Sequence, residues 1–411
     1  MANALTRLLG RARDKPIENR VSDVPTVNFG FSQTHEPVTP ISSMRLTAVY
    51  ACVRVIAETI AGLPCGIYRT SADGKGSEKV LDHPLWRLLH DEPNHEMTSF
   101  VWRELISTQL LLWGNAYCQL IRDGTGRVVE IWPLNPMQMQ VDRDDNGVLV
   151  YLYTNSKGIT TRLRPVIDVL HVPALGFDGI MGYSPIALEK NAVGLGLSAE
   201  RYGANFFGNS AVPTGVLEHP GTIKDPTRLR ETWQATYGGA NNAGKTAILE
   251  EGMKFQTIGV PNSDAQFLET RKFQVTEICR IFRVPPHMIA DLEHATFSNI
   301  EHQEISFVQN TIVPWVRRLE QSFDRAMLTD ADRRQHCFTR FNVDGLMRGD
   351  YQSRMNGYAV GRQNGWMSAN DIRALEDMPP IPADQGGDAY LVNGNMIPAS
   401  LAMQGGYQRQ D

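Results

Sequence analysis

The feature that most constrains the fold is one long run of apolar residues spaced three or four positions apart. The run opens at a helix-capping box, Ser298–Glu301, and continues to about Leu328. Its members share one face of a helix and are Ile305, Val308, Ile312, Val316, Leu319, Phe323 and Met327. This spacing predicts a helix on the order of 45 Å long. Pro314 lies inside the run and cannot donate a backbone hydrogen bond, so we expect a helix kink there.

The first part of the chain has the signals of a mixed helix and strand domain. Apolar spacing predicts helices at Met44–Gly62 and Ser99–Trp113. Runs bounded by turn residues predict short strands at Pro64–Thr70, Ala116–Arg122, Val128–Trp132, Met137–Asp142 and Val148–Thr154. Asp123-Gly124 and Asp145–Gly147 are suited to hairpin turns. Residues 25–183 are therefore expected to form one α+β domain.

The middle of the chain predicts a small module between two helices. Ser184-Pro185 indicates the start of a helix that ends near Phe207, and a capping box at Ser263–Gln266 opens another that ends before Val284. The segment between them, residues 210–262, predicts strands and one helix at Thr214–Glu218, Asp225–Tyr237, Thr246–Glu250 and Lys254–Gly259. Such a module can be a docking surface or a plain surface excursion, and the sequence leaves both open.

The two ends of the chain have different signals. Residues 1–24 contain a charged, polar stretch with Pro16 and are expected to be a mobile arm. After a strand at Cys337–Val343, two helices are expected at Asp350–Gln363 and Ser368–Asp377, followed by a flexible tail over residues 379–411. The pair resembles a helix-turn-helix, but its second helix carries three acidic residues and one arginine, which favours packing over DNA contact.

The charge of the chain argues against a protein that grips DNA tightly. The net charge is −5, and the sequence pI is about 6.1. A protein that clamps DNA neutralises many phosphates with lysine and arginine, and this chain is mildly acidic. A conduit through which DNA slides has the opposite requirement, because strong phosphate contacts would hold the DNA in place.

The cysteines and apolar runs favour a reducing cytoplasm. The chain has five cysteines, Cys52, Cys65, Cys118, Cys279 and Cys337, with no Cys-x-x-Cys pair. Neither a disulfide framework nor a zinc site is indicated, and Cys52 and Cys279 are expected to be buried free thiols. We expect no membrane span, since no apolar run reaches roughly 18 residues, and no secretory signal.

One segment, Gly239–Thr246, matches the phosphate-binding loop of nucleotide-binding enzymes letter for letter. That loop works when a strand precedes it and a helix follows, because the helix N-terminus then faces the phosphates. Here the predicted order is reversed, with a helix before and a strand after. We therefore expect a turn, and a nucleotide-binding enzyme remains the disfavoured alternative.

Other apparent chemical motifs also have simpler explanations. Gly194–Ala199 imitates a dinucleotide-binding fingerprint but lies inside a predicted helix. Polar side chains with metal-binding potential gather near the long helix without the spacing of a metal site, and are His287, His294, Glu301, His302 and Glu304. No nucleophile elbow, acid pair or catalytic triad is found. We expect no enzyme activity, no cofactor and no metal.

Eight short segments, in this order, resemble the compact portal proteins of long-tailed double-stranded DNA phages and prophages. The resemblance runs from about Thr47 to Gly387. The segments are Ala48–Val53, Leu112–Tyr117, Ile131–Leu134, Gly182–Ile186, Asp264–Glu269, Phe282–His287, Ser298–Glu301 and Gly365–Asp371. Each is weak alone, and together they identify the family.

The resemblance implies names for the predicted parts. Residues 25–183 would be the wing, 184–209 and 263–284 the two stem helices, and 210–262 the clip. The tunnel loop would be 285–297 and the kinked tunnel helix 298–329. Residues 330–347 would return a strand to the wing, and 348–378 would form the crown helices.

The resemblance also implies a function and partners. The chain would form a homo-oligomeric ring, usually a dodecamer, at one capsid vertex of the virion after assembly in the host cytoplasm. Double-stranded DNA would pass through it without sequence specificity. Its protein partners would be the terminase large subunit, the head-completion adaptor, and the major capsid and scaffold proteins.

Three groups of residues are candidates for these roles. Small residues on a helix with no local partner are expected to pack against a neighbouring subunit, and are Gly194, Gly196, Ala199 and Gly203. Mixed charges on the clip helix are expected to dock the motor and adaptor, and are Lys224, Asp225, Arg228, Arg230 and Glu231. Polar residues of the tunnel loop and helix are expected to face DNA, and are His287, Asp291, Glu293, His294, Thr296 and Asn299.

Overall fold

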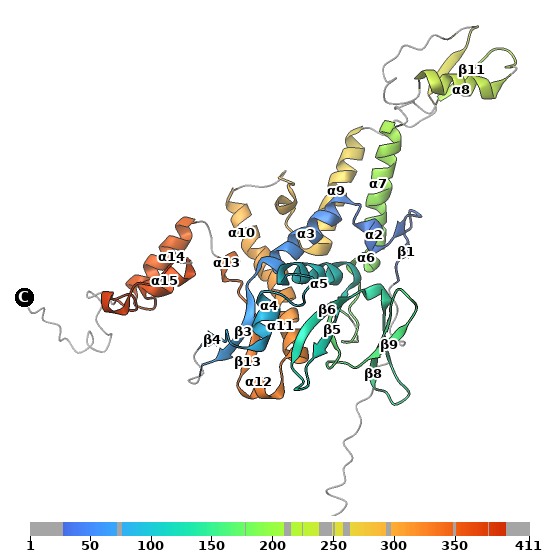
Figure 1. Ribbon diagram of the computed structural model, residues 1–411. Helices are drawn as coiled ribbons and strands as arrows, with labels where there is room; N and C mark the ends of the chain where they lie inside the picture. Colours follow the sequence, from blue (N-terminus) through green and yellow to red (C-terminus); the bar gives the residue numbers. More distant parts are fainter. Residues whose placement is uncertain are drawn as a thin grey trace, which may run out of the picture. The chain divides into compact units, whose positions relative to one another are not determined.

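The computed structural model describes residues 28–71, 76–176, 178–208, 215–223, 225–237, 249, 251–257, 264–292, 297–347, 351–376 and 378–391. The expected N-terminal arm, the Gly239–Thr246 segment and most of the strand predicted at Thr246–Glu250 lie outside these residues. The chain divides into two compact units, one ending at Asn342 and one beginning at Val343. Helices and sheets are mixed, as the α+β prediction requires (Figure 1).

Two of the predicted helices are confirmed and lie at the centre of the first unit. They are α3 (Thr47–Gly62) and α5 (Ser99–Trp113), which pack against each other. Each buries the stripe that its apolar spacing defines, and α5 ends at Gly114, whose left-handed backbone (φ 75°) suits glycine. Two shorter helices, α2 (Pro40–Ser43) and α4 (Pro84–His90), were not predicted; each has proline in its first turn.

Three small antiparallel sheets surround these helices. Their strand orders are β10-β5-β6, β13-β3-β4 and β7-β8-β9. The strands are β3 (Cys65–Thr70), β4 (Ser77–Lys79), β5 (Asn115–Arg122), β6 (Val128–Leu134), β7 (Met139–Arg143), β8 (Leu149–Thr154), β9 (Thr160–Leu163), β10 (Val169–Pro173) and β13 (Cys337–Phe341). A further pair, β1 (Gly30–Phe31) and β2 (Pro37–Val38), precedes α2. The predicted hairpin turns do connect β5 to β6 and β7 to β8.

Helix α11 (Val313–Met327) joins the sheets to the helical core. It packs against both β10 and β13. The ring of Phe323 is fully buried and stacks on Trp102 of α5, with 5.3 Å between ring centroids. Phe341 of β13 lies on another side of Phe323, at 6.2 Å. The second half of the long predicted helix is therefore the centre of the core.

Two carboxylates of α11 bond the outer edge of β13. Glu320 Oε1 accepts the backbone N–H of Phe341 at 2.8 Å, and Asp324 Oδ1 accepts that of Thr339 at 2.6 Å. Glu320 is buried and also accepts a bond from Arg317 at 2.9 Å. The two acids lie one turn apart on α11, and the two amides lie two residues apart on β13. One turn of helix and two residues of strand have similar lengths, so both hydrogen bonds can form together.

The helices before and after the inserted module differ partly from prediction. The first one is broken at Glu189 into α6 (Pro185–Leu188) and α7 (Lys190–Gly208). The second is α9 (Asp264–Phe282), which packs beside α7 (Figure 1). Within the module, β11 (Gly215–Glu218) pairs with β12 (Lys254–Thr257), and α8 (Pro226–Tyr237) stacks Trp233 on Phe255.

The second unit is small and helical. Its helices are α13 (Asp344–Met347), α14 (Tyr351–Gln363) and α15 (Ala369–Leu375), and Ser368 caps α15 in a capping box with Asp371. Part of the tail that was expected to be flexible forms hydrogen bonds with these helices. Asn370 exchanges two hydrogen bonds with Ile381 (2.7 and 2.9 Å), and Arg362 donates to the carbonyl of Ala389 at 2.6 Å.

Candidate functional site

The start of α6 is tied to the end of α5 by one asparagine. Asn115 Oδ1 accepts the N–H of Gly182 at 2.9 Å, and Asn115 Nδ2 donates to the carbonyl of Gly182 at 2.7 Å. Ser184 Oγ donates to the carbonyl of Leu112 at 2.5 Å and accepts from Ala187 at the start of α6. Two segments separated by 67 residues in sequence thus form one junction.

His171 completes this junction in its neutral form. Its Nε2 donates to Asn115 Oδ1 at 3.0 Å, and its Nδ1 accepts from the hydroxyl of Tyr151 at 2.9 Å. The ring stacks on Tyr117, with 4.5 Å between centroids. Burial lowers the pKa of His171 to about 3, so the imidazole is uncharged at neutral pH. Its two ring bonds hold the side chain of Asn115 in place against Gly182.

Two glycines allow the junction to close. A Cβ atom on Gly114 would overlap the carbonyl oxygen of Tyr183, and one on Gly182 would overlap the carbonyl oxygen of Gly114. The two backbones therefore touch directly, and no other residue fits at either position. These glycines were part of the segments that carry the family resemblance, but the sequence did not show that they meet.

The small residues of α7 pack within their own chain. Gly194 lies against the Ser32 side chain, and a Cβ on Gly196 would come 2.8 Å from Leu46. No partner for this helix is near in the sequence, but β1, α2 and α9 of the same chain, all distant in sequence, pack against it. Gly203 is buried and Ala199 half-buried. Packing of Ala199 and Gly203 against a neighbouring subunit stays a prediction.

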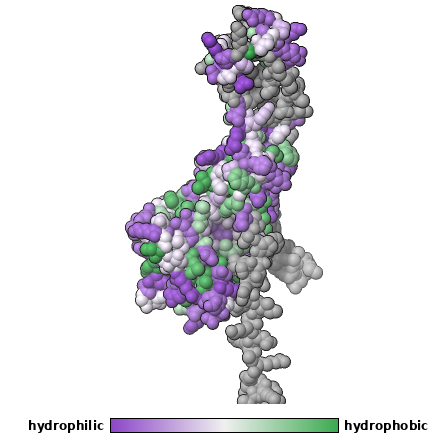
Figure 2. Space-filling model, turned by 90° about the vertical axis from the view of Figure 1, so that its right-hand side faces the viewer, coloured by the Kyte–Doolittle hydropathy of each residue, from purple (hydrophilic) through white to green (hydrophobic). Residues whose placement is uncertain are grey.

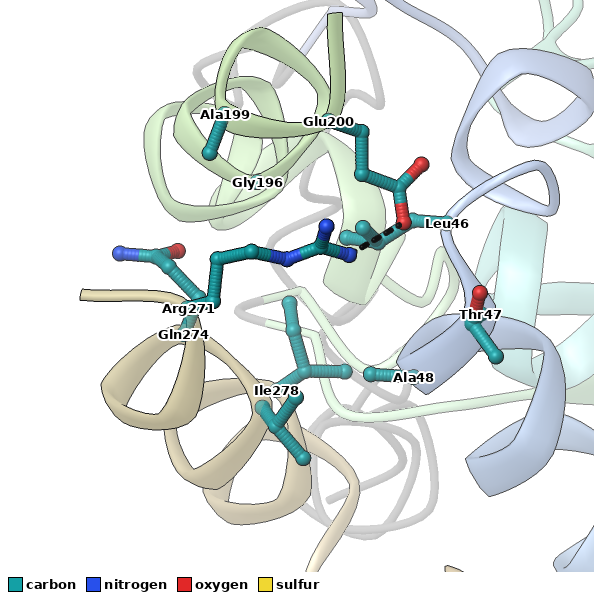
Figure 3. A pocket seen from close by; sticks show the side chains of 10 residues that line it. Leu46, Thr47, Ala48, Gly196, Ala199, Glu200, Arg271, Gln274 and Ile278 are labelled. Atoms are coloured by element: carbon teal, nitrogen blue, oxygen red, sulfur yellow. Dashed lines mark ion pairs between the residues drawn. The ribbon is translucent and has the colours of Figure 1, made fainter. Parts of the chain in front are cut away.

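A small cavity of about 50 Å³ separates α7 from α9 (Figure 3). Arg271 of α9 extends across its mouth toward Glu200 of α7, and the charged atoms are 3.6 Å apart. Leu46 and Ile278 line its apolar side. The cavity is too small for a ligand, and its residues hold the two helices together.

The loop after α9 is partly structured. Pro286–Ile289 form a single 3-10 turn that packs against α3, and Ala290 closes it with a left-handed backbone. His287 Nδ1 lies 2.8 Å from Gln303 Oε1 and so links the turn to α10 (Phe297–Phe307). Asp291 is half-buried. Glu293, His294 and Thr296 lie outside the described residues, and Asn299 is on α10, where its side chain is not described.

The stretch from the loop after α9 to the start of α11 has acidic residues but no basic ones. No lysine or arginine occurs between Arg283 and Arg317. The acidic residues of that stretch are Asp291, Glu293, Glu301 and Glu304. A polyanion that approached the stretch would meet acidic and neutral polar groups and no fixed cation.

The long helix changes its bonding pattern just before Pro314. Residues Val308–Ile312 form a π-helical turn between α10 and α11, and Val313 N–H donates to the carbonyl of Val308, five residues back. Pro314 is then in the first turn of α11, where its missing N–H is tolerated. A kink at Pro314 stays a prediction.

The docking candidates lie around the start of α8. Asp225 is the N-cap residue, and its carboxylate accepts the N–H of Arg228 at 3.0 Å. Arg228, Arg230 and Glu231 are exposed, and Lys224 lies outside the described residues. Figure 2 shows the part that carries α8 as mostly hydrophilic on that face. Asp225 therefore has a structural role, whereas the arginines are available to a partner.

Among the described residues, no cluster of His, Cys, Asp and Glu has a metal-binding arrangement, and no helix is long and apolar enough to cross a membrane. All five cysteines are buried and free, which confirms the expectation for Cys52 and Cys279. Helix α8 precedes the Gly239–Thr246 segment, as predicted, whereas a phosphate-binding loop would have a strand there.

Three comparisons with known proteins agree. A family model described as phage portal protein matches residues 47–377. The chain is 37% identical to the probable portal protein of Streptomyces phage phiC31 over 388 residues, which covers 88% of this chain and 80% of that protein. It is 32% identical to the portal protein of Enterobacteria phage HK97 over 361 residues, which covers 86% and 83%. A chain in the neck of a native gene transfer agent particle, computed with C12 symmetry, has the same fold, with a TM-score of 0.56, 22% identity and coverage of 88% and 98%.

Proposed function

Because the chain belongs to the phage portal protein family, we propose that twelve copies of it close into a ring at one vertex of a capsid. Double-stranded DNA passes through the ring during packaging and again during ejection. The observation that carries this proposal is the family match, which spans both structural units. The C12 symmetry of the gene transfer agent neck supports the number twelve.

The parts of the chain have distinct roles in this proposal. The sheets of residues 25–183 form the wing, α6, α7 and α9 the stem, and the β11–β12 module the clip. The loop at 285–297 and α10 line the DNA channel, and the helices of residues 348–378 form the crown. Support comes from the elements themselves, since a two-stranded module is inserted between α7 and α9, and β13 returns to pair with β3.

The clip docks the terminase large subunit during packaging and the head-completion adaptor afterwards. A partner that binds and later leaves suits a charged surface, because charge complementarity sets orientation and on-rate without a large apolar contact. The exposed Arg228, Arg230 and Glu231 provide such a surface. The major capsid and scaffold proteins surround the ring during assembly in the host cytoplasm, and the virion vertex is its final location.

The ring is the first test of this proposal. Purified protein at micromolar concentration should give closed rings with a central pore in electron micrographs, and twelvefold assemblies in native mass spectrometry. Co-expression with the scaffold protein is the control, because some rings assemble only when scaffold protein is present. Monomers or twofold dimers under both conditions would contradict the proposal.

The channel surface predicts a salt-dependent effect on packaging. Asp291→Lys with Glu293→Lys should leave the ring intact and slow DNA packaging, because lysine exchanges counterions for phosphate contacts. The slowing should be several-fold at 50 mM salt and smaller at 200 mM. Packaging rate against ionic strength is the measurement. The control, Asp145→Lys with Glu96→Lys, makes the same charge change at exposed wing positions. Equal rates for the two double variants at low salt would show that the loop does not approach DNA.

A further inference from the structure

The π-helical turn at Val308–Ile312 separates α10 from α11, and its geometry fixes how the two helices are oriented. A π-turn holds one residue more than an α-turn. Val313 N–H reaches the carbonyl of Val308 and skips the carbonyl that an α-helix would use. Conversion of this turn to α geometry would rotate α10 about its axis by about 100° relative to α11.

One side chain from outside the helix bonds this turn. Pro314 has no N–H, so the carbonyl of Asn310 lacks its α-helical donor. Arg283 Nη1 donates to that carbonyl at 3.3 Å. Thr311 Oγ1 donates to the carbonyl of Arg283 at 2.7 Å, and Thr311 is buried. Consecutive residues of the turn are therefore both bonded to Arg283.

The backbone of Arg283 indicates that the side chain is needed there. Its φ is +55°, and Val284 N–H donates to the carbonyl of Cys279 at 2.9 Å, which is the usual closure of a helix by glycine. The left-handed conformation is less stable for arginine than the right-handed one. The chain retains a long cationic side chain at a position that favours glycine.

The turn also has open space on two sides. One cavity of about 330 Å³ and another of about 400 Å³ are each lined by Arg283, Asn310 and Thr311. The first continues to Leu111 and Tyr183, near the junction of α5 with α6, and the second to Pro286 in the loop after α9. Val308 and Ile312 are buried on the inner side of the turn, whereas the carbonyl of Asn310 and the side chain of Arg283 lie beside these cavities, where hydrogen bonds and not packing hold them.

We propose that Arg283 is a positioning residue that holds the turn at Val308–Ile312 in π geometry and thereby sets the orientation of α10. Its guanidinium replaces the amide that Pro314 lacks. The consequence for DNA rests on the proposed function, because α10 carries Asn299, Glu301 and Glu304. Loss of the bond leaves α10 free to change its orientation, and a different set of side chains then faces the channel.

The test is a double-mutant cycle read by hydrogen exchange on the assembled ring without DNA. Arg283→Gly removes the donor and also the backbone strain, so the thermal midpoint should stay within a few degrees while amides of residues 303–313 exchange at least tenfold faster. In a Pro314→Ala background, the new amide at 314 bonds Asn310, so Arg283→Gly should change exchange less than threefold. Arg280→Ala, one turn earlier on α9, is the control and should leave exchange unchanged.

Two results overturn the proposal. One is exchange in Arg283→Gly within twofold of the parent protein, and the other is an equally large effect in the Pro314→Ala background. Neither result bears on the proposed portal function, because the exchange experiment contains no DNA. Packaging rate is measured in parallel and should fall in Arg283→Gly and recover in the double variant. Faster exchange with unchanged packaging would instead overturn the assignment of α10 to the DNA channel.

Discussion

Replacing Gly114 by alanine is expected to destabilise the folded chain by about 3 kcal/mol or more, through left-handed backbone strain and overpacking. The φ of Gly114 is 75°, and an added Cβ would overlap the carbonyl oxygen of Tyr183. That carbonyl belongs to backbone, which cannot move aside as a side chain can. The thermal midpoint should fall by roughly 4 °C or more, and infected cells should contain few DNA-filled particles, because the start of α6 separates from α5.

Two further variants make this result specific. Gly182→Ala changes the opposite side of the same contact and should have a similar effect, since its Cβ would overlap the carbonyl of Gly114. Gly124→Ala, in the turn after β5, is the control because no atom lies within 4 Å of its added Cβ. Midpoints of all three variants within 2 °C of each other would mean that the junction does not hold the helices to the wing.

Reversing two arginines of the clip is expected to reduce DNA packaging at least tenfold while the ring remains intact. The change is Arg228→Glu with Arg230→Glu. Both side chains are exposed, and Arg228 is in the first turn of α8, where a negative charge favours the helix dipole. The Asp225 cap bonds the backbone N–H of residue 228 and so survives the change. A loss of packaging therefore reports docking and not folding.

The measurement is packaging efficiency together with direct binding of the terminase large subunit to the ring. The matched control reverses two exposed arginines of the wing unit, Arg127→Glu with Arg334→Glu. Control rings should bind the motor as the parent does. If the clip variant also binds and packages normally, the motor docks elsewhere.

Local signals in the sequence were enough to predict much of the fold. Helix α5 has an apolar stripe, a threonine cap and a terminal glycine within its own residues, so its bounds agree with prediction. The long helix itself was predicted from its apolar stripe, and it runs from α10 through the π-turn into α11. By contrast, the sequence gives only weak local signals for the split at Glu189 and for strand β10. Strand β10 pairs with β5, and α6, which ends at the split, packs against α5.

The candidate site was less predictable because its parts are distant in sequence. Asn115 and Gly182 meet across 67 positions, and Arg283 meets Asn310 across 27. Nothing near Asn115 in the sequence shows which backbone it bonds. The glycines of α7 were expected to face another subunit because small residues allow close approach, but small residues do not show which neighbour approaches.

The bonds from α11 to β13 have a consequence for a ring of many copies. An outer strand with unbonded amides can recruit a strand from another chain, and neighbouring subunits in a ring are held at very high local concentration. At β13, the amides of Thr339 and Phe341 already donate to Asp324 and Glu320. Strand-to-strand extension between copies is therefore blocked along this edge of β13, so a neighbouring copy can contact it only through side chains.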